Sequence, residues 1–143
     1  MNGFRARAER RGLRFLHRPC EGTYESTAGT LARILADRPD TTGFVVQNEA
    51  AIGPLLNLLR ASGRTVPEDA SVIAICPETM AEQHAPRLTS VTGPRKDLGQ
   101  VAVDQVMTRI AATATGDEPE DQLLLMPPEL VVRESTAPAP RRS

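Results

Sequence analysis

The sequence has almost no net charge and no long apolar run. Its 17 Lys and Arg residues nearly balance 18 Asp and Glu residues, for a formal charge of -1, so no overall field draws the chain to nucleic acid or to a membrane surface. No stretch approaches the roughly 18 apolar residues of a membrane-spanning helix, and the first residues contain no signal-peptide core. We therefore expect a cytoplasmic protein that does not bind membranes and has no DNA-binding surface of its own.

Cysteine and histidine are also scarce. Cys20 and Cys76 have no second cysteine or histidine at the spacing of a zinc site. His17 and His84 have no nucleophile or carboxylate at a spacing that suggests acid–base catalysis. The sequence indicates two buried, reduced thiols, no metal, no cofactor and no enzyme activity.

What the chain does have is enough apolar sequence for one packed core, with 40% hydrophobic residues among 143. Near the start, residues 3–12 predict a short amphipathic helix that Gly12 ends. The apolar run 13–17 follows as a brief strand. Ser26 or Thr27 is then placed to cap a second helix.

Two apolar runs in the middle of the chain, 43–47 and 71–76, have the continuous character of strands that are covered on both faces. Asn48 is expected to cap the helix between them, and Pro54 should kink this helix or shift its start. Strands that alternate with helices indicate an α/β fold with a parallel sheet. The core-facing stripe of the helix consists of Ile52, Leu55, Leu56 and Leu59.

Further elements are predicted beyond residue 76. They are a short helix or loop over 77–85, a strand over 88–92, a helix over 96–113, a loop over 116–120, short strands over 123–125 and 130–132, and a disordered tail over 137–143. The apolar face of the long helix should point inward onto a second lobe, so in this chain alone we expect it to be uncovered. It consists of Leu98, Val101, Val106 and Ile110.

Three strings of residues carry a resemblance to a known family. They are Val66-Pro67-Glu68-Asp69-Ala70-Ser71-Val72-Ile73, Pro86-Arg87-Leu88-Thr89-Ser90-Val91 and Pro128-Glu129-Leu130-Val131-Val132-Arg133-Glu134-Ser135-Thr136. In this order and spacing they resemble the lactose/galactose-repressor family of bacterial transcription regulators. Gly3–Arg5 and Gln47–Gly53 extend the likeness over most of the chain. None of these strings is catalytic.

The resemblance implies a partial effector-binding domain over residues 1–136, in the type I periplasmic-binding-protein fold of two hinged α/β lobes. Residues 3–87 and 121–136 would form the C-terminal lobe. Residues 88–116 would form a hinge crossover and a helix of the other lobe, and 137–143 a tail. The resemblance also implies that a DNA-binding head and a central strand of the sheet would precede Met1, so we expect an incomplete sheet and a chain that is marginally stable, dimeric or prone to aggregate.

Candidate effector contacts should follow the strands, because ligands of open α/β sheets bind at the carboxyl ends of the strands. The resemblance places Tyr24 where an aromatic ring stacks on a sugar or base, and Gln47 and Asn48 where polar side chains bind the ligand. Cys76 stands where many members have an anchoring aspartate. Two alternatives stay open: Tyr24 can be a surface tyrosine, and Asn48 can be only an N-cap.

The implied function is the ligand-sensing part of a regulator that binds a small sugar-like effector and acts on DNA through its separate head. The resemblance also implies a homodimer, with Ile52 and Leu55 in its interface. Two alternatives are a periplasmic sugar-binding protein with the same fold and a truncated remnant that binds no ligand.

Overall fold

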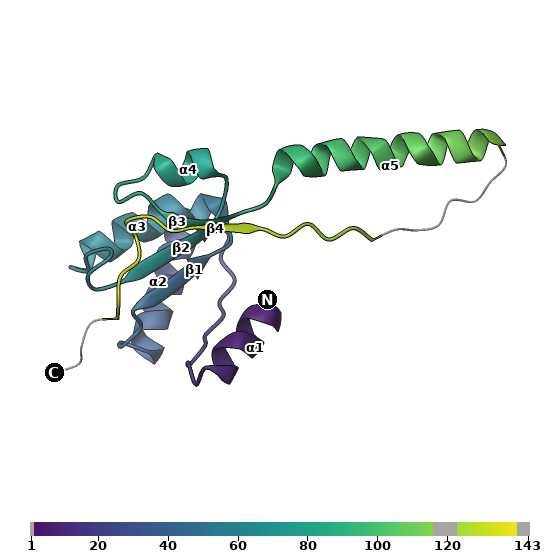
Figure 1. Ribbon diagram of the computed structural model, residues 1–143. Helices are drawn as coiled ribbons and strands as arrows, with labels where there is room; N and C mark the ends of the chain where they lie inside the picture. The colour runs from purple at the N-terminus through teal and green to yellow at the C-terminus, as the bar shows by residue number, and fades with distance from the viewer. Residues whose placement is uncertain (1, 116–122, 140–143) are drawn as a thin grey trace.

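A computed structural model describes residues 2–115 and 123–139. Its centre is a mixed four-stranded sheet in the order β1-β2-β3-β4 (Figure 1). The first three strands are parallel, and β4 is antiparallel to β3. This confirms the predicted α/β class and the strands expected near residues 43, 71 and 88. The strands are β1 Gly43–Val46, β2 Ser71–Ile75, β3 Thr89–Thr92 and β4 Glu129–Val131.

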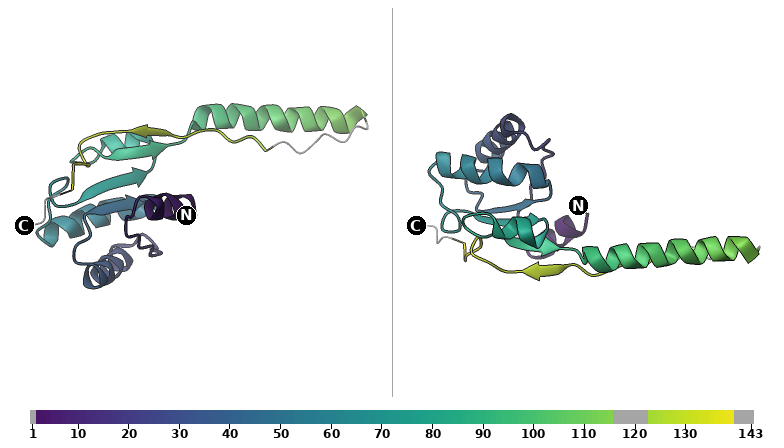
Figure 2. Two further views of the ribbon diagram at one scale, coloured as in Figure 1. Left: turned by 60° about the horizontal axis from the view of Figure 1, so that its bottom comes forward. Right: turned by 90° about the horizontal axis from the view of Figure 1, so that it is seen from above.

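The described residues also form five α-helices and one 3-10 turn. They are α1 Asn2–Arg10, α2 Tyr24–Asp37, the 3-10 turn η1 Glu49–Ala51, α3 Ile52–Ala61, α4 Glu78–Glu82 and α5 Arg95–Thr115. Helices α2 and α3 pack together, and α4 packs near β3. In contrast, α5 extends away from the sheet in every view (Figures 1 and 2). None of the described helices is both long enough and apolar enough to cross a bilayer.

The end of α1 follows the sequence prediction. Gly12 has a φ of 66°, a left-handed conformation that glycine adopts without a steric penalty. The Gly12 N–H donates to Glu9 O at 2.9 Å, and the Leu13 N–H donates to Ala8 O at 3.0 Å. This pair of hydrogen bonds is a Schellman motif, which satisfies carbonyls at the end of a helix.

The start of α2 differs from the prediction. Thr23, rather than Ser26 or Thr27, is the N-cap, and its side-chain oxygen accepts a hydrogen bond from the Ser26 N–H at 3.1 Å. Thr27 is buried, and its hydroxyl donates to Thr23 O instead. The helix therefore begins at Tyr24.

The start of α3 confirms the shift expected from Pro54, but Asn48 caps the preceding turn η1, and the N-cap of α3 is Ala51, which makes no side-chain capping hydrogen bond. Asn48 caps η1, since its side-chain oxygen accepts from the Ala50 N–H at 3.1 Å. The α-helix starts only at Ile52, which places Pro54 in its first turn. A proline in the first turn costs the helix no hydrogen bond, because the N–H that it lacks would have no partner within the helix.

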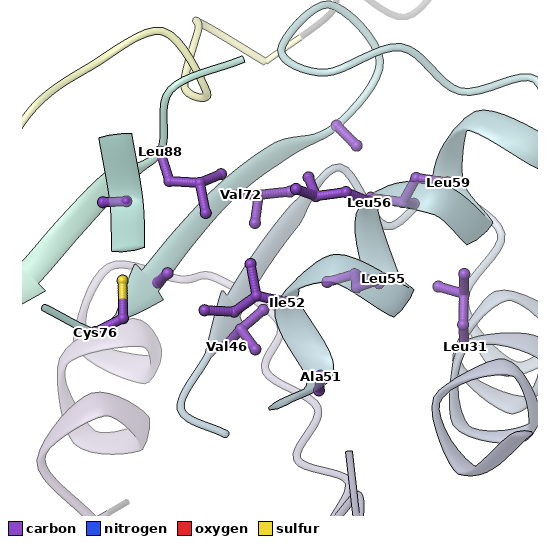
Figure 3. Close-up of a cluster of buried hydrophobic side chains, with 13 residues drawn as sticks. Leu31, Val46, Ala51, Ile52, Leu55, Leu56, Leu59, Val72, Cys76 and Leu88 are labelled. Atoms are coloured by element: carbon purple, nitrogen blue, oxygen red, sulfur yellow. The ribbon is translucent and has the colours of Figure 1, made fainter. Parts of the chain in front are cut away.

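The hydrophobic core lies between α3, α2 and the parallel strands (Figure 3). All four residues of the predicted α3 stripe are buried. The other labelled members of this cluster are Leu31, Val46, Ala51, Val72, Cys76 and Leu88.

The segment near residue 135 is hydrogen bonded to β2 and β3 near the amino ends of these strands. The Ser135 hydroxyl donates to Val72 O, and the Thr89 N–H donates to Ser135 Oγ at 2.8 Å. The Val72 N–H also donates to Ser135 O at 2.8 Å. Ala137, which was predicted to begin the disordered tail, is hydrogen bonded to Ser71.

Two predicted strands are wrong. Residues 13–17 and 123–125 are irregular, because neither segment lies in register with another strand of the described chain. Among the residues that the structure describes, no strand lies on the outer side of β1, and β4 begins only at Glu129. An apolar run forms a strand only where a second backbone completes its hydrogen bonds.

The apolar face of the long helix does not point into the described core, and its exposure agrees with the expectation that nothing in this chain covers it. Leu98, Val106 and Ile110 are exposed, and Val101 is only half-buried. The predicted helix itself is confirmed, but no surface of the described residues covers its apolar side chains. The predicted loop over 116–120 lies outside the described residues.

Candidate functional site

The three parallel strands end at one edge of the sheet. Val46 pairs with Ala74, and Ile75 pairs with Val91. Residues that directly follow β1 and β2, Gln47 and Cys76 among them, therefore come to the same edge. This edge is where open α/β sheets bind their ligands.

Asn48 uses both ends of its side-chain amide. In addition to capping η1, its Nδ2 donates to Cys20 O at 3.0 Å. Gly22 makes this approach possible, because a Cβ atom there would lie 2.8 Å from Ala50 Cβ and 2.9 Å from Asn48 Nδ2. The turn before α2 is thus held directly against η1.

Tyr24 and Gln47 are the predicted site residues with free polar groups. Tyr24 is the first residue of α2 and is 58% exposed. Gln47 is exposed, and within the described chain its amide makes no hydrogen bond. Because the turn before α2 packs on Asn48, Tyr24 comes to the same edge as Gln47. Contact of either residue with an effector stays a prediction.

Cys76 differs from the other three candidates because it is only 3% exposed and belongs to the hydrophobic core (Figure 3). Burial raises the pKa of its thiol, and the Glu49 carboxylate raises it further, against the opposing charges of Arg133 and Arg95. The thiol is therefore neutral at physiological pH. Its predicted contact with an effector is untested.

A charged rim surrounds this thiol. Arg95, at the start of α5, pairs with Glu49 at 3.1 Å. The Arg133 guanidinium is nearly buried, and it donates to Ser90 Oγ at 2.8 Å and Glu78 Oε1 at 2.9 Å. Neither pair could be predicted from the sequence, because the partners lie far apart in the chain and share no local spacing.

Cys20 was expected to be a buried thiol, but it is only half-buried, and its hydrogen bonds alter the pKa of the thiol. Burial raises the pKa of its thiol, but hydrogen bonds with the Thr27 hydroxyl, the Gly22 N–H and the Ser26 hydroxyl outweigh that effect. The net pKa lies below the ordinary value of a cysteine thiol. Cys20 is half-buried beside the start of α2.

The two residues predicted for a dimer interface, Ile52 and Leu55, are 1% and 7% exposed. Both side chains point into the core (Figure 3). Direct contact with a second subunit through them has no support in the described fold, and a dimer through α3 stays an untested prediction. The polar residues that α3 exposes are Asn57 and Arg60.

The described residues contain no group of three or more His, Cys, Asp or Glu side chains that could hold a metal ion. The edge therefore offers neutral hydrogen-bonding groups, an aromatic ring and paired charges. Such a set of groups can bind a small polar molecule.

Comparison with known proteins identifies the family. The family described as periplasmic binding protein-like domain matches residues 1–136. The chain therefore belongs to the periplasmic binding protein-like domain family. Its relatives within that family are transcription regulators of the LacI type, which confirms the resemblance in the sequence.

Two relatives illustrate this similarity. The regulator CelR of Thermobifida fusca is 34% identical over 113 residues, which cover 79% of this chain and 32% of the relative. The repressor PurR of Vibrio cholerae is 33% identical over 80% of this chain and 34% of its own length. The chain thus spans about a third of the length of these regulators.

Solved structures agree with the sequence comparison. A CelR complex with cellobiose superimposes with a TM-score of 0.78 at 30% identity, over 93% of this chain and 40% of that one. A LacI-family regulator from Arthrobacter sp. FB24 in complex with lactose also gives a TM-score of 0.78, at 26% identity. That match covers 95% of this chain and 50% of the other.

Proposed function

We propose that this chain is the effector-binding part of a LacI-type transcription regulator and that it binds a small sugar-like molecule at the carboxyl edge of β1 and β2. The observation that carries this proposal is that an exposed aromatic ring, Tyr24, and an exposed amide, Gln47, flank the contact between Asn48 and the turn before α2 at that edge. Two structural relatives hold cellobiose and lactose, which supports a sugar as the ligand class. All the relatives reported above are regulators, which supports a binding role rather than an enzymatic one.

The side chains suit the chemistry of a sugar. The face of a tyrosine ring covers the C–H face of a sugar and excludes water there, while the hydroxyls stay free to form hydrogen bonds. A glutamine amide both donates and accepts, as a hydroxyl ligand requires. Asn48 keeps one N–H and one lone pair beyond its two hydrogen bonds within the fold.

The floor of the site is less polar than the resemblance implies for many family members. The buried Cys76 thiol is a weak hydrogen-bond acceptor compared with a carboxylate. We therefore propose an effector that is less polar than a simple hexose, or that carries another functional group, such as the glycosidic linkage of a disaccharide.

Regulation would follow from closure between two lobes. We propose that residues 3–87 and 121–136 act as one lobe and that 88–116 supply the hinge and a helix of the other. A ligand that binds the closed arrangement more tightly shifts the population toward it and so alters DNA binding elsewhere in a cytoplasmic homodimer. The net charge of -1 gives this chain no electrostatic attraction of its own for DNA.

Tyrosine fluorescence offers a direct test, because the chain has one tyrosine and no tryptophan. The emission of the chain therefore reports on Tyr24 alone. We expect cellobiose or lactose to change this emission in a saturable way. We expect Gln47→Ala to weaken that binding about five- to tenfold, as the loss of one hydrogen bond does.

Two controls decide the outcome. Asn57→Ala, on the exposed side of α3, should leave the titration unchanged, and mannitol, an open-chain polyol without a ring face, should not change the emission. A titration that does not saturate with either sugar, or that Gln47→Ala leaves unaltered, would contradict the proposed site.

A further inference from the structure

The ion pair between Glu49 and Arg95 spans the carboxyl edge of the sheet. Glu49 lies three residues beyond the end of β1, and Arg95 lies three residues beyond the end of β3. Because β2 separates these two strands, the 3.1 Å contact crosses the end of β2, where Cys76 follows. Both charges shift the pKa of the Cys76 thiol, in opposite directions. The Arg95 guanidinium is therefore part of the edge that holds the proposed site.

Arg95 keeps most of its capacity to form hydrogen bonds. A guanidinium carries five N–H donors in a rigid, planar fork. Within the described part of the chain, Arg95 donates once, from Nη2 to Glu49 Oε1, and its side chain is 66% exposed. Four of its donors are thus left for a ligand.

The other arginine beside Cys76 is not available in this way. Arg133 Nη1 donates to Leu88 O at 3.1 Å and to Ser90 Oγ at 2.8 Å, and Nη2 pairs with two glutamates of α4. Its side chain is only 9% exposed. The fold neutralises this charge, so of the two arginines only Arg95 can reach a ligand.

The Glu49 carboxylate indicates which group suits the Arg95 guanidinium. It makes a single contact, and its side chain is 40% exposed. An exposed ion pair of this kind changes an equilibrium by less than about fivefold. A bidentate hydrogen bond between a guanidinium and an oxyanion is stronger, with an effect of about tenfold or more. An oxyanion on a ligand can therefore displace Glu49.

The surroundings suit a ligand that joins a sugar ring to an anionic group. The Cys76 thiol is buried and neutral, so it does not repel a negative charge. Tyr24 and Gln47 are exposed at the same edge. Because Glu49 follows Gln47 by two residues, a ligand that contacts Gln47 also lies near the guanidinium that Glu49 holds.

We propose that the effector is an anionic sugar derivative, whose carboxylate or phosphate displaces Glu49 and binds the Arg95 guanidinium. This inference rests on the proposed function, because it assumes a sugar ring at Tyr24 and Gln47. It specifies the additional functional group that the proposed function allows. Arg95 becomes the residue that determines specificity, and Glu49 becomes a competitor of the ligand.

Two disaccharide derivatives that differ only in the acidic group test this inference. Lactobionate and lactitol share a galactose ring and an open polyol chain, but the chain ends in a carboxylate in lactobionate and in a neutral alcohol in lactitol. In isothermal titration calorimetry, lactobionate should bind about tenfold or more tightly than lactitol. About 0.5 M NaCl should reduce this preference, because salt screens exposed charges. A parallel comparison of glucose 6-phosphate with glucose distinguishes a phosphate from a carboxylate.

Substitutions of the two partners should have opposite effects. Arg95→Gln should lower the preference for lactobionate to less than about twofold, and Arg95→Lys should keep only part of it, because an ammonium group lacks the planar fork. Glu49→Gln should instead strengthen lactobionate binding by about twofold to fivefold, because it removes the competing carboxylate. A purely structural ion pair would not give opposite effects for its two partners.

The matched control is Arg60→Gln, which removes an exposed arginine from the end of α3 that is far from η1. It should change the preference by less than about twofold, as a distant surface substitution does. Circular dichroism checks that each variant is folded. If Arg95→Gln does not fold, Arg95→Lys and Glu49→Gln still decide the question.

The outcomes separate this inference from the proposed function. If lactose binds but neither acidic compound binds more tightly than its neutral counterpart, the inference is overturned and the proposed function stands. If none of the sugars or their derivatives binds, both are overturned. A preference that survives Arg95→Gln, or that Glu49→Gln abolishes, also overturns the inference.

Discussion

Helices α3 and α5 both carry apolar stripes, but only one of them is covered. The stripe of α3 is buried under α2 and the parallel strands, with Leu59 at 0% exposure. In α5, Val106 and Ile110 are more than half exposed. The comparison shows that the periodicity of a sequence identifies which face of a helix is apolar. Whether that face is buried depends on a second surface that packs on it, and of these two helices only α3 has such a surface among the described residues.

The largest difference in stability is expected between substitutions in the two apolar stripes. We expect Leu59→Ala to reduce the free energy of unfolding by about 2–5 kcal/mol, because it removes contacts and leaves a cavity in the core. Val106→Ala should change it by less than about 0.5 kcal/mol. Urea unfolding of both variants measures the difference, and similar losses would mean that α5 is packed in solution.

The next effect concerns how the end of the chain is attached to the core. Ser135→Ala removes the hydroxyl that accepts from the buried Thr89 N–H. We expect a loss of about 1–3 kcal/mol in the free energy of unfolding, the cost of leaving such a donor without a partner. Thr113→Ala in α5 is the control, since its hydroxyl bonds only to Arg109 O on an exposed helix. If both substitutions are neutral, the attachment at Ser135 does not stabilise the sheet.

A smaller effect is expected where α3 begins. Asn48→Ala deletes the cap of η1 and the hydrogen bond to Cys20 O, so the chain should lose about 1 kcal/mol of stability. Asn57→Ala on the exposed side of α3 should be nearly neutral. Thermal unfolding compares them, and an Asn48→Ala chain as stable as the parent would show that the cap is dispensable.

The smallest expected effect is a difference in chemical reactivity between the two thiols, which leaves the fold unchanged. The pKa of Cys20 is lowered and that of Cys76 is raised, so at neutral pH Cys20 has the larger thiolate fraction and is also more accessible. We expect iodoacetamide to modify Cys20 first, with a rate that levels off at a lower pH than for a free cysteine. Mass spectrometry of digested samples measures both rates. Faster reaction at Cys76 would contradict the described burial.

Much of the fold was predictable from local sequence. The three parallel strands, the α3 stripe, the Gly12 helix end and the Asn48 cap each depend on residues within a few positions of one another. The predictions that failed, the strands at 13–17 and 123–125, required a partner strand from elsewhere, and the apolar face of α5 is exposed because it too has no partner surface among the described residues. Apolar character alone does not reveal whether that partner is present.

The features of the candidate site likewise divide into those that local sequence predicts and those that depend on tertiary packing. Tyr24, Gln47 and Asn48 could be chosen because side chains that follow parallel strands meet at one edge. The burial of Cys76 was also expected, because cysteine is among the most often buried residue types. The pairing of Arg133 with Glu78 could not be predicted, because it results from tertiary packing between segments that are distant in the chain.

Hydrogen exchange of the unmodified chain tests the central comparison most directly. Amides in the middle of α3 open only when the core does, so they should exchange slowly, whereas amides of α5 should exchange much faster because no packed surface holds that helix. Mass spectrometry of peptides that cover residues 52–61 and 98–110 resolves the two helices. Slow exchange in α3 with fast exchange in α5 is the predicted result, and equal protection of the two helices would contradict the account.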